Sequence, residues 1–294
     1  RDLVRSRGLG DVYKRQVDRF FADLENPEYE MKPTDPEFCI QVIEKTICHQ
    51  QGEMLDGTPL RGKPFLLEPF HKFIIYNLLG FKIAGTNIVR FHEALIFIPR
   101  KNIKTSFAAA LSWALSLRYR KSGAKTYIVG AALVQTLESF NFLKYNIDRM
   151  GENAKDGGTV RVIDNNNEHS LSATLSDGSF YVRALAANPD AQDSLNCNVA
   201  ICDEIHAYKQ PKQYNLFREA MKAYTNKLLI GISTAGDNEQ LFLGQRLKYC
   251  RKVLDGTIKD EQYFIFMCCA NPDENGDIDY TNPVVHEMAN PAYG

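Results

Sequence analysis

Lys104 and Thr105 stand between an apolar run and a helix-like segment, a position from which they could bind phosphate. The apolar run Ala94–Ile98 has the pattern of a strand, and Thr105–Tyr119 has the pattern of a helix that is buried on most sides. In a phosphate-binding loop, backbone N–H groups and a helix N-terminus face the anion, a lysine reaches the terminal phosphates, and a hydroxyl binds Mg²⁺. The stretch therefore predicts a nucleotide site, and the alternative is a basic turn that only begins a helix.

One residue of this stretch, Ile103, departs from the phosphate-loop pattern, which has glycine at that position. A β-branched residue tolerates a positive φ poorly, whereas glycine adopts it readily. We therefore expect an altered loop, and we predict that Ile103→Gly raises the rate of ATP turnover if the isoleucine side chain strains the loop.

Two adjacent carboxylates, Asp203 and Glu204, follow the apolar strand-like run Asn198–Cys202. Phosphoryl transfer needs a metal that neutralises charge and a group that orients the attacking water. Asp203 suits the Mg²⁺ shell, and Glu204 suits the catalytic role beside it. The alternative is an acidic pair on a surface loop.

Small and hydroxyl residues, Ser233, Thr234 and Gly236, close the next apolar run, Lys227–Ser233. At a strand end such residues could sense the γ-phosphate, and they could equally form an ordinary turn. Because open α/β sheets bind ligands at the carboxyl ends of their strands, we expect all three strand ends to meet at one edge.

The elements that must position these residues alternate between strand and helix, which predicts an α/β fold with a mostly parallel sheet flanked by helices. Turn signals between residues 157 and 196 predict an inserted antiparallel hairpin. The remaining expected elements are helices at Phe65–Phe81, Gln135–Met150, Tyr214–Tyr224 and Glu239–Leu254, and strands at Thr126–Ala132 and Tyr263–Ala270.

Composition narrows the possible functions. With 294 residues and 44% hydrophobic content, the chain can bury a large core, and its net charge of −1 gives no overall attraction to nucleic acid. The seven cysteines contain no C-x-x-C pair, which favours reduced buried thiols and disfavours a structural zinc site. No apolar run is long enough to span a membrane.

The chain divides into four expected parts. Residues 1–16 resemble translated adapter sequence ("GLGDVYKRQ") and are expected to be a non-native tail. An N-terminal helical lid segment is expected over 17–64 and a nucleotide-binding core over 65–260, and residues 261–294 are expected to begin a linker.

The order of motifs resembles the large terminase subunit of tailed bacteriophages, in the branch whose phosphate loop is Pro-Arg-Lys-Asn-Gly-Lys. The resemblance covers residues 65–294 and rests on PRKNIKT, AANPDAQDSLNCNVAICDEIHAY, LLIGISTAGDN and NPAYG. It implies a P-loop ATPase of the RecA-like, additional-strand type that uses ATP and Mg²⁺. It also implies a ring of subunits on the portal protein that packages double-stranded DNA with a small terminase subunit, in the cytoplasm of the infected host. A nuclease domain would lie beyond Gly294.

The resemblance also implies a role for each matching residue. The loop residues would hold the nucleotide, with Thr105 and Asp203 on the metal, Glu204 as the catalytic carboxylate and Arg100 as a γ-phosphate sensor. The segment around Phe70 and His71 is similar to the adenine-contacting motif, in which glutamine usually stands where this chain has His71. The implied nucleotide-binding residues are Pro99, Lys101, Asn102, Lys104, Thr105, Ser106, Phe70, His71, Ser233, Thr234 and Gly236.

Two alternatives remain open from the sequence. "DEIH" and "STAG" superficially match the motifs of a DExH-type helicase, which would need a second RecA-like domain. Ile103 and His71 make a degenerate, non-catalytic ATP-binding scaffold subunit conceivable.

Overall fold

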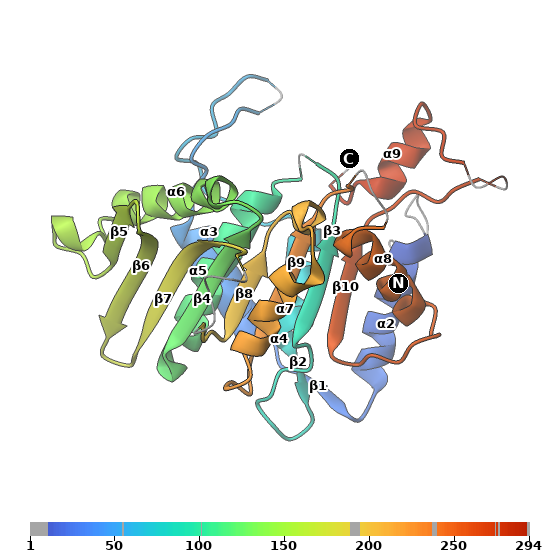
Figure 1. Ribbon diagram of the computed structural model, residues 1–294, viewed down its shortest axis with the longest axis horizontal. Coiled ribbons are helices and arrows are strands. Elements are labelled where there is room, and N and C mark those ends of the chain that lie inside the picture. Colours follow the sequence, from blue (N-terminus) through green and yellow to red (C-terminus); the bar gives the residue numbers. More distant parts are fainter. Residues whose placement is uncertain are drawn as a thin grey trace.

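A computed structural model describes residues 11–54, 56–100, 102–188, 195–236, 240–273, 275 and 277–292 (Figure 1). Its centre is an eight-stranded sheet with the order β10-β3-β9-β8-β4-β7-β6-β5. The strands are β3 (Glu93–Phe97), β4 (Ala124–Gly130), β5 (Arg161–Asn165), β6 (Glu168–Leu175), β7 (Gly178–Ala186), β8 (Val199–Cys202), β9 (Leu228–Ser233) and β10 (Tyr263–Met267).

The six strands from β10 to β7 pair in parallel, and β5, β6 and β7 pair antiparallel. The predicted α/β class and the antiparallel insertion are both confirmed, and the insertion widens the sheet beyond β4. Strand β9 lies between β3 and β8, so an additional strand separates the two strands that carry the phosphate loop and the acidic pair.

Helices cover both faces of the sheet because its strands are apolar on both sides. In β3, Ala94 and Ile96 face one core cluster, and Leu95 faces the other. The first cluster is covered by α3 (Thr34–Thr46), α4 (Pro69–Gly80), α5 (Lys104–Tyr119) and α6 (Leu133–Met150). The second is covered by α7 (Pro211–Ala220) and α8 (Phe242–Leu254).

The N-terminal part of the chain packs closely on this core. Helix α2 (Asp11–Glu25) contains residues 11–16, which we predicted to be non-native, and residues 1–10 lie outside the described residues. Gln16 is buried and pairs with Met267 of β10, donating to its carbonyl and accepting from its N–H at 2.9 Å each. The packing of residues 11–16 does not test their origin, which stays a prediction.

The segment expected to be a lid contributes α3, which packs on α5. The indole N–H of Trp113 donates to the Thr46 hydroxyl at 3.2 Å. A short two-stranded sheet of β1 (Tyr29–Met31) and β2 (Phe81–Ile83) joins this segment to the end of α4. The role of a lid stays a prediction.

At the other end of the chain, β10 pairs with β3. The sheet therefore extends past residue 260, where we predicted the core to end and the linker to begin. After β10 the chain forms α9 (Pro283–Ala289), which lies near the carboxyl ends of the strands (Figure 1).

Candidate functional site

The phosphate-loop motif and the acidic pair meet at one edge of the sheet. Strands β3, β9 and β8 are parallel neighbours, so their carboxyl ends lie side by side. The Thr105 hydroxyl is 3.5 Å from the Asp203 carboxylate (Oγ1 to Oδ2), although the two residues are 98 positions apart in the chain. The phosphate loop and the acidic pair are therefore close to each other, as a shared nucleotide site requires.

The loop before α5 has a left-handed backbone at Ile103, a conformation that a β-branched residue rarely adopts. Ile103 has φ +54° and precedes the first residue of α5, and the residue is 44% exposed. A left-handed backbone at a β-branched residue costs about 1–2 kcal/mol. The loop thus keeps the conformation that glycine favours, with the isoleucine side chain turned partly to solvent.

A second left-handed residue lies across the site. Glu204 has φ +48°, and among the described residues only Ile103 and Glu204 are non-glycine residues with a positive φ. Such strain persists where the surrounding structure holds it, and it clusters at functional sites. Both strained residues of the described chain belong to the two motifs that could bind and hydrolyse a nucleotide.

Lys104 is buried and lies folded back over the loop. Its ammonium donates to the Pro99 carbonyl at 3.4 Å. Burial lowers the pKa of Lys104, and the nearby charges of Glu204 and Asp203 act in the opposite direction. Because burial has removed much of the water around the Lys104 ammonium, an anionic ligand at the loop would stabilise its positive charge.

Asp203 is the buried member of the acidic pair. Burial raises its pKa to about 6, and the charge of Glu204 adds to this effect. The backbone N–H of Glu204 donates to Asp203 Oδ1 at 2.9 Å. A divalent cation beside this carboxylate would favour its ionised form, and a carboxylate with a hydroxyl suits Mg²⁺, which also takes substrate phosphates and waters.

Glu204 faces the residues that follow β9. Its Oε2 accepts from the Thr234 N–H and from the Thr234 hydroxyl, both at 3.4 Å. The same oxygen is 3.0 Å from Nδ1 of His206. The structure therefore brings Ser233 and Thr234 to the acidic pair, since the Ser233 hydroxyl accepts from the His206 N–H at 3.1 Å.

His206 is a residue to which the sequence assigned no role. A Cβ placed on Gly236 would lie 2.9 Å from the His206 Cβ, so the glycine permits close packing of the loop after β9 on His206. The signal was the histidine of "DEIH", two positions after Glu204, but its orientation depends on η4 (Ile205–Ala207) and on β9.

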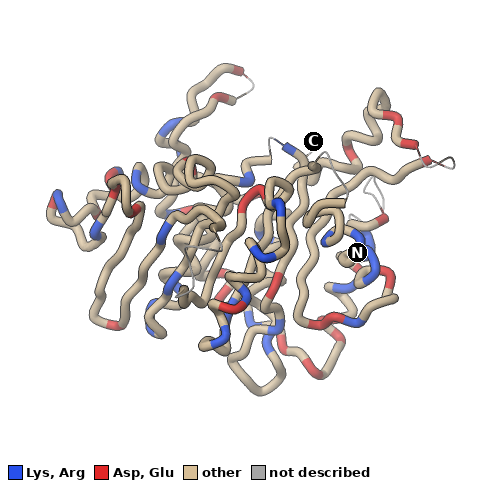
Figure 2. The backbone as a smooth tube through the Cα atoms, viewed as in Figure 1, with Lys and Arg blue, Asp and Glu red and all other residues tan. Residues whose placement is uncertain are grey.

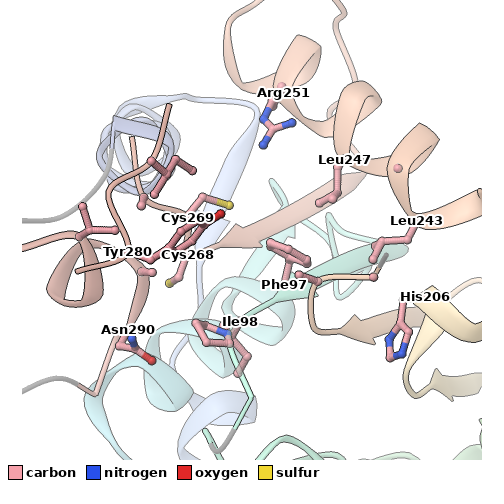
Figure 3. Close-up of a pocket in the computed structure, with 18 of the residues that line it drawn as sticks. Phe97, Ile98, His206, Leu243, Leu247, Arg251, Cys268, Cys269, Tyr280 and Asn290 are labelled. Carbon is pink, nitrogen blue, oxygen red and sulfur yellow. The ribbon is translucent and has the colours of Figure 1, made fainter. Parts of the chain in front are cut away.

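Beside the site lies a cavity of about 470 Å³ between the strand ends, α8 and the C-terminal segment. Leu243 and Leu247 project from α8 on one side of it, Tyr280 lies across from them, and Ile98 and His206 also line it (Figure 3). The cavity begins at Pro99 of the phosphate loop, so a ligand on the loop would have open space on this side.

Asn290 is the second residue whose place the sequence did not reveal. Asn102 donates from Nδ2 to its own loop, at the carbonyls of Pro99 (3.2 Å) and Arg100 (3.4 Å), and also to Oδ1 of Asn290 at 3.2 Å. The NPAYG motif, seen only as a sequence likeness, therefore begins in direct contact with the phosphate loop.

His71 is buried in the first turn of α4. Its ring lies between Phe70 and Phe107 with centroid distances of 3.9 and 4.4 Å, and burial lowers its pKa to about 3. Nδ1 accepts from the Glu68 N–H at 3.2 Å, which leaves the proton of the neutral ring on Nε2. That Nε2 is buried without a hydrogen-bond partner among the described residues.

The other predicted residues take less specific positions. Arg100 is exposed, Ser106 is half-buried in the first turn of α5, and Phe70 stacks on Phe266 with a centroid distance of 6.0 Å. Lys101 lies outside the described residues. Lys, Arg, Asp and Glu residues are spread along much of the described chain (Figure 2), and the site is marked by the buried charges of Lys104 and Asp203.

Comparison with known proteins identifies a family. The model of the family described as "Terminase large subunit, ATPase domain" matches residues 69–252. No curated protein matches the chain. None of the helices within the described ranges is long and apolar enough to cross a membrane.

One solved structure has a similar fold over most of this chain. The large terminase of bacteriophage HK97 is 21% identical with a TM-score of 0.64, over 88% of this chain and 48% of that one. A large terminase from a thermophilic bacteriophage, in complex with ADP, is 11% identical with a TM-score of 0.44, over 60% and 40%. The complex of the same terminase with ATP-gamma-S is 12% identical with a TM-score of 0.40, and the match again covers 60% of this chain and 40% of that one. The chain spans about half the length of the HK97 protein.

Proposed function

The chain belongs to the family of terminase large-subunit ATPase domains, and from this premise we propose that it hydrolyses Mg·ATP at the edge formed by β3, β8 and β9. The observation that carries the proposal is the approach of Thr105 to Asp203 at 3.5 Å beside the buried ammonium of Lys104.

Binding is assigned first to the phosphate loop. Its backbone N–H groups and the N-terminus of α5 would face the phosphates, with Lys104 on the terminal ones. Lys104 would exchange the Pro99 carbonyl for phosphate oxygens, a stronger, charge-assisted contact. The further loop residues assigned to the nucleotide are Pro99, Lys101, Asn102 and Ser106.

Thr105 and Asp203 would hold Mg²⁺, which neutralises phosphate charge when bound. The elevated pKa of Asp203 fits this role, because a buried carboxylate without a cation is the costly state. Asp203 also accepts the Glu204 N–H, which fixes its orientation toward Thr105.

Glu204 would orient the attacking water, and its surroundings control where its carboxylate points. In the described structure the carboxylate is held by Thr234 and lies 3.0 Å from His206. Loss of the γ-phosphate would reach the loop after β9 through these contacts, so Ser233, Thr234 and Gly236 would couple hydrolysis to movement. Arg100, exposed at the loop, would add positive charge at the γ-phosphate.

We assign the adenine end to Phe70 and His71. The neutral Nε2–H of His71 is a buried donor without a partner among the described residues. One donor cannot read the donor and acceptor of adenine together, as glutamine can. We therefore propose weaker selectivity for adenine over other bases than a glutamine would give.

In the full-length protein, this domain would drive double-stranded DNA into the procapsid in the cytoplasm of the infected host. It would act as a ring of copies on the portal protein, with a small terminase subunit, and a metal-dependent nuclease would lie outside this chain. The phosphate-loop sequence supports the branch with the Pro-Arg-Lys-Asn-Gly-Lys pattern.

The test is Mg²⁺-dependent ATP hydrolysis by the purified chain, with and without linear double-stranded DNA. We expect hydrolysis by the wild type, loss of ATP binding in Lys104→Ala, and retained binding without turnover in Glu204→Gln. Glu219→Gln is the charge-matched control, because Glu219 is exposed and pairs with Lys222 in α7 and the turn after it. ATP binding by the wild type without hydrolysis under any condition would favour the non-catalytic scaffold.

A further inference from the structure

A second polar cavity lies at the opposite edge of the sheet. It has a volume of about 580 Å³. Ser122, Asn198 and Asn226 line it, and they stand just before β4, β8 and β9. The cavity is therefore at the amino ends of the strands, whereas the phosphate loop is at their carboxyl ends, and none of the residues assigned to ATP lines it.

The wall of this cavity carries a surplus of positive charge. Lys82 is 3% exposed, and its ammonium pairs with Asp35 Oδ2 at 2.8 Å. Arg118 binds the same carboxylate with two nitrogens, one of them at 2.7 Å from Oδ2. Lys32 also lines the cavity and pairs with the half-exposed Glu30 at 3.2 Å. Two cations thus share Asp35, and one positive charge stays without a counter-charge in this cluster.

Burial makes that surplus costly. It lowers the pKa of Lys82, and the charges of Arg118 and Lys32 lower the same pKa further, against the opposing effect of Asp35. A buried charge is stable when it is paired and hydrogen-bonded. An anion in the cavity would supply the missing counter-charge.

Neutral donors face the same space. The side chain of Asn198 is 1% exposed and accepts the Lys125 N–H at 2.8 Å through Oδ1. Asn198 also lines the cavity, and its side-chain amide is the neutral donor that we assign to an anion there. Helix α3 begins at Thr34, which lines the cavity, and its N-cap residue Pro33 provides no side-chain cap. The dipole of this 13-residue helix favours negative charge at that end, where Asp35 and Glu37 of the first turn already supply part of it.

We propose that this cavity binds a phosphate group between Lys32, Lys82, Arg118 and Asn198. Planar guanidinium, ammonium and amide donors that converge from several directions suit a tetrahedral oxyanion with several acceptor oxygens. The phosphate could belong to a small phosphorylated molecule or to the backbone of double-stranded DNA. The inference does not depend on the proposed ATPase mechanism, because the two sites share no residue.

The experiment is calorimetric titration with inorganic phosphate of the chain saturated with Mg·ADP, so that the phosphate loop is occupied. The first variant is Asn198→Asp, which keeps the acceptor for Lys125 but removes the donor and adds a negative charge. The second is Lys32→Gln, at a half-buried residue whose loss leaves the Asp35 pairs intact. The control is Lys121→Gln, which removes an exposed charge from the neighbouring turn η1 (Arg120–Ser122) without touching the cavity wall.

We expect Asn198→Asp to weaken phosphate binding about tenfold or more, Lys32→Gln to weaken it severalfold, and Lys121→Gln to leave it unchanged. Fluorescence anisotropy with a short DNA duplex identifies the source. If duplex affinity falls in the two cavity variants and phosphate competes with the duplex, the phosphate is that of DNA.

If phosphate binding depends on the cavity residues but duplex binding does not, the ligand is a small phosphorylated molecule. The proposal is overturned if the folded Asn198→Asp and Lys32→Gln variants bind both phosphate and duplex as the wild type does. It is also overturned if the wild type binds neither. If Mg·ADP fails to fill the phosphate loop, inorganic phosphate that binds there will bind equally well to the cavity variants and the wild type. A failure of nucleotide binding can therefore be distinguished from a failure of the proposed cavity site.

Discussion

Replacing Ile103 with glycine should stabilise the chain, although glycine normally destabilises a protein. The residue has φ +54° at the start of α5, and a side chain with a Cβ costs about 1–2 kcal/mol in that region. Glycine removes this cost but loses about 0.5–1 kcal/mol through the greater entropy of the unfolded chain. At the midpoints of these ranges the balance is a gain of about 0.75 kcal/mol, reduced by whatever contacts the half-exposed isoleucine side chain makes.

Ile103→Ala is the matched control, because it also removes those contacts but keeps a Cβ in the left-handed region. Ile103→Gly should therefore be more stable than Ile103→Ala by about 0.5–1 kcal/mol, whereas in a helix interior glycine is less stable than alanine by a similar amount. Urea denaturation measures the difference as a shift in midpoint at constant slope. If alanine is as stable as glycine, the left-handed conformation is not strained and our reasoning fails.

The same pair of variants tests whether the strain affects catalysis. If the isoleucine Cβ distorts the loop, ATP turnover should rise in Ile103→Gly and not in Ile103→Ala. Equal turnover in the wild type and both variants would show that the loop tolerates the side chain without loss of function.

Three further predictions follow from the acidic pair. Glu204→Gln should retain ATP affinity and lose about 10²–10⁴ in turnover, as expected for a positioned base, and normal steady-state hydrolysis would contradict its role. In the metal-free chain the pKa of Asp203 is about 6 in the folded state and 3.8 in the unfolded state, so the folded state binds the proton more tightly. The resulting contribution to the free energy of unfolding is fully present below about pH 4 and is lost as the pH rises through 6. The free energy of unfolding of the wild type minus that of Asp203→Asn should fall over this range, and a flat difference would exclude the elevated pKa. His206→Ala should lower kcat severalfold with little change in KM for ATP, since it releases the Glu204 carboxylate, and a change confined to KM would assign His206 to substrate binding.

The fold could be predicted because its signals are local. Apolar runs of strand length alternate with helical patterns, and the chemistry-bearing residues Lys104, Asp203 and Ser233 lie at or shortly after the ends of three of those runs. Parallel pairing then brings the three strand ends to one edge, so their proximity follows from the topology. The family resemblance implied an additional strand in the sheet, but the local patterns gave no strand order, and the place of β9 between β3 and β8 is known only from the structure.

The missed features depend on contacts between distant residues. Asn290 meets Asn102 across 188 positions, and Gln16 meets Met267 across 251. Local sequence patterns carry no information on such pairs. The position of His206 likewise depends on the left-handed backbone of Glu204 and on the packing of Gly236. The Ile103 side chain disfavoured the loop geometry in isolation, but the surrounding structure imposes that geometry nevertheless.

The most direct test of the central claim is a double-mutant cycle on the affinity for Mg·ATPγS, with Thr105→Val, Asp203→Asn and the double variant. If the hydroxyl and the carboxylate hold one metal on one nucleotide, removing either disrupts the same site. The double variant should then bind only slightly more weakly than the weaker single variant, with a coupling of about 0.5–3 kcal/mol. Losses that add to within about 0.3–0.5 kcal/mol would mean that the two residues act independently, and the shared Mg·ATP site would be refuted.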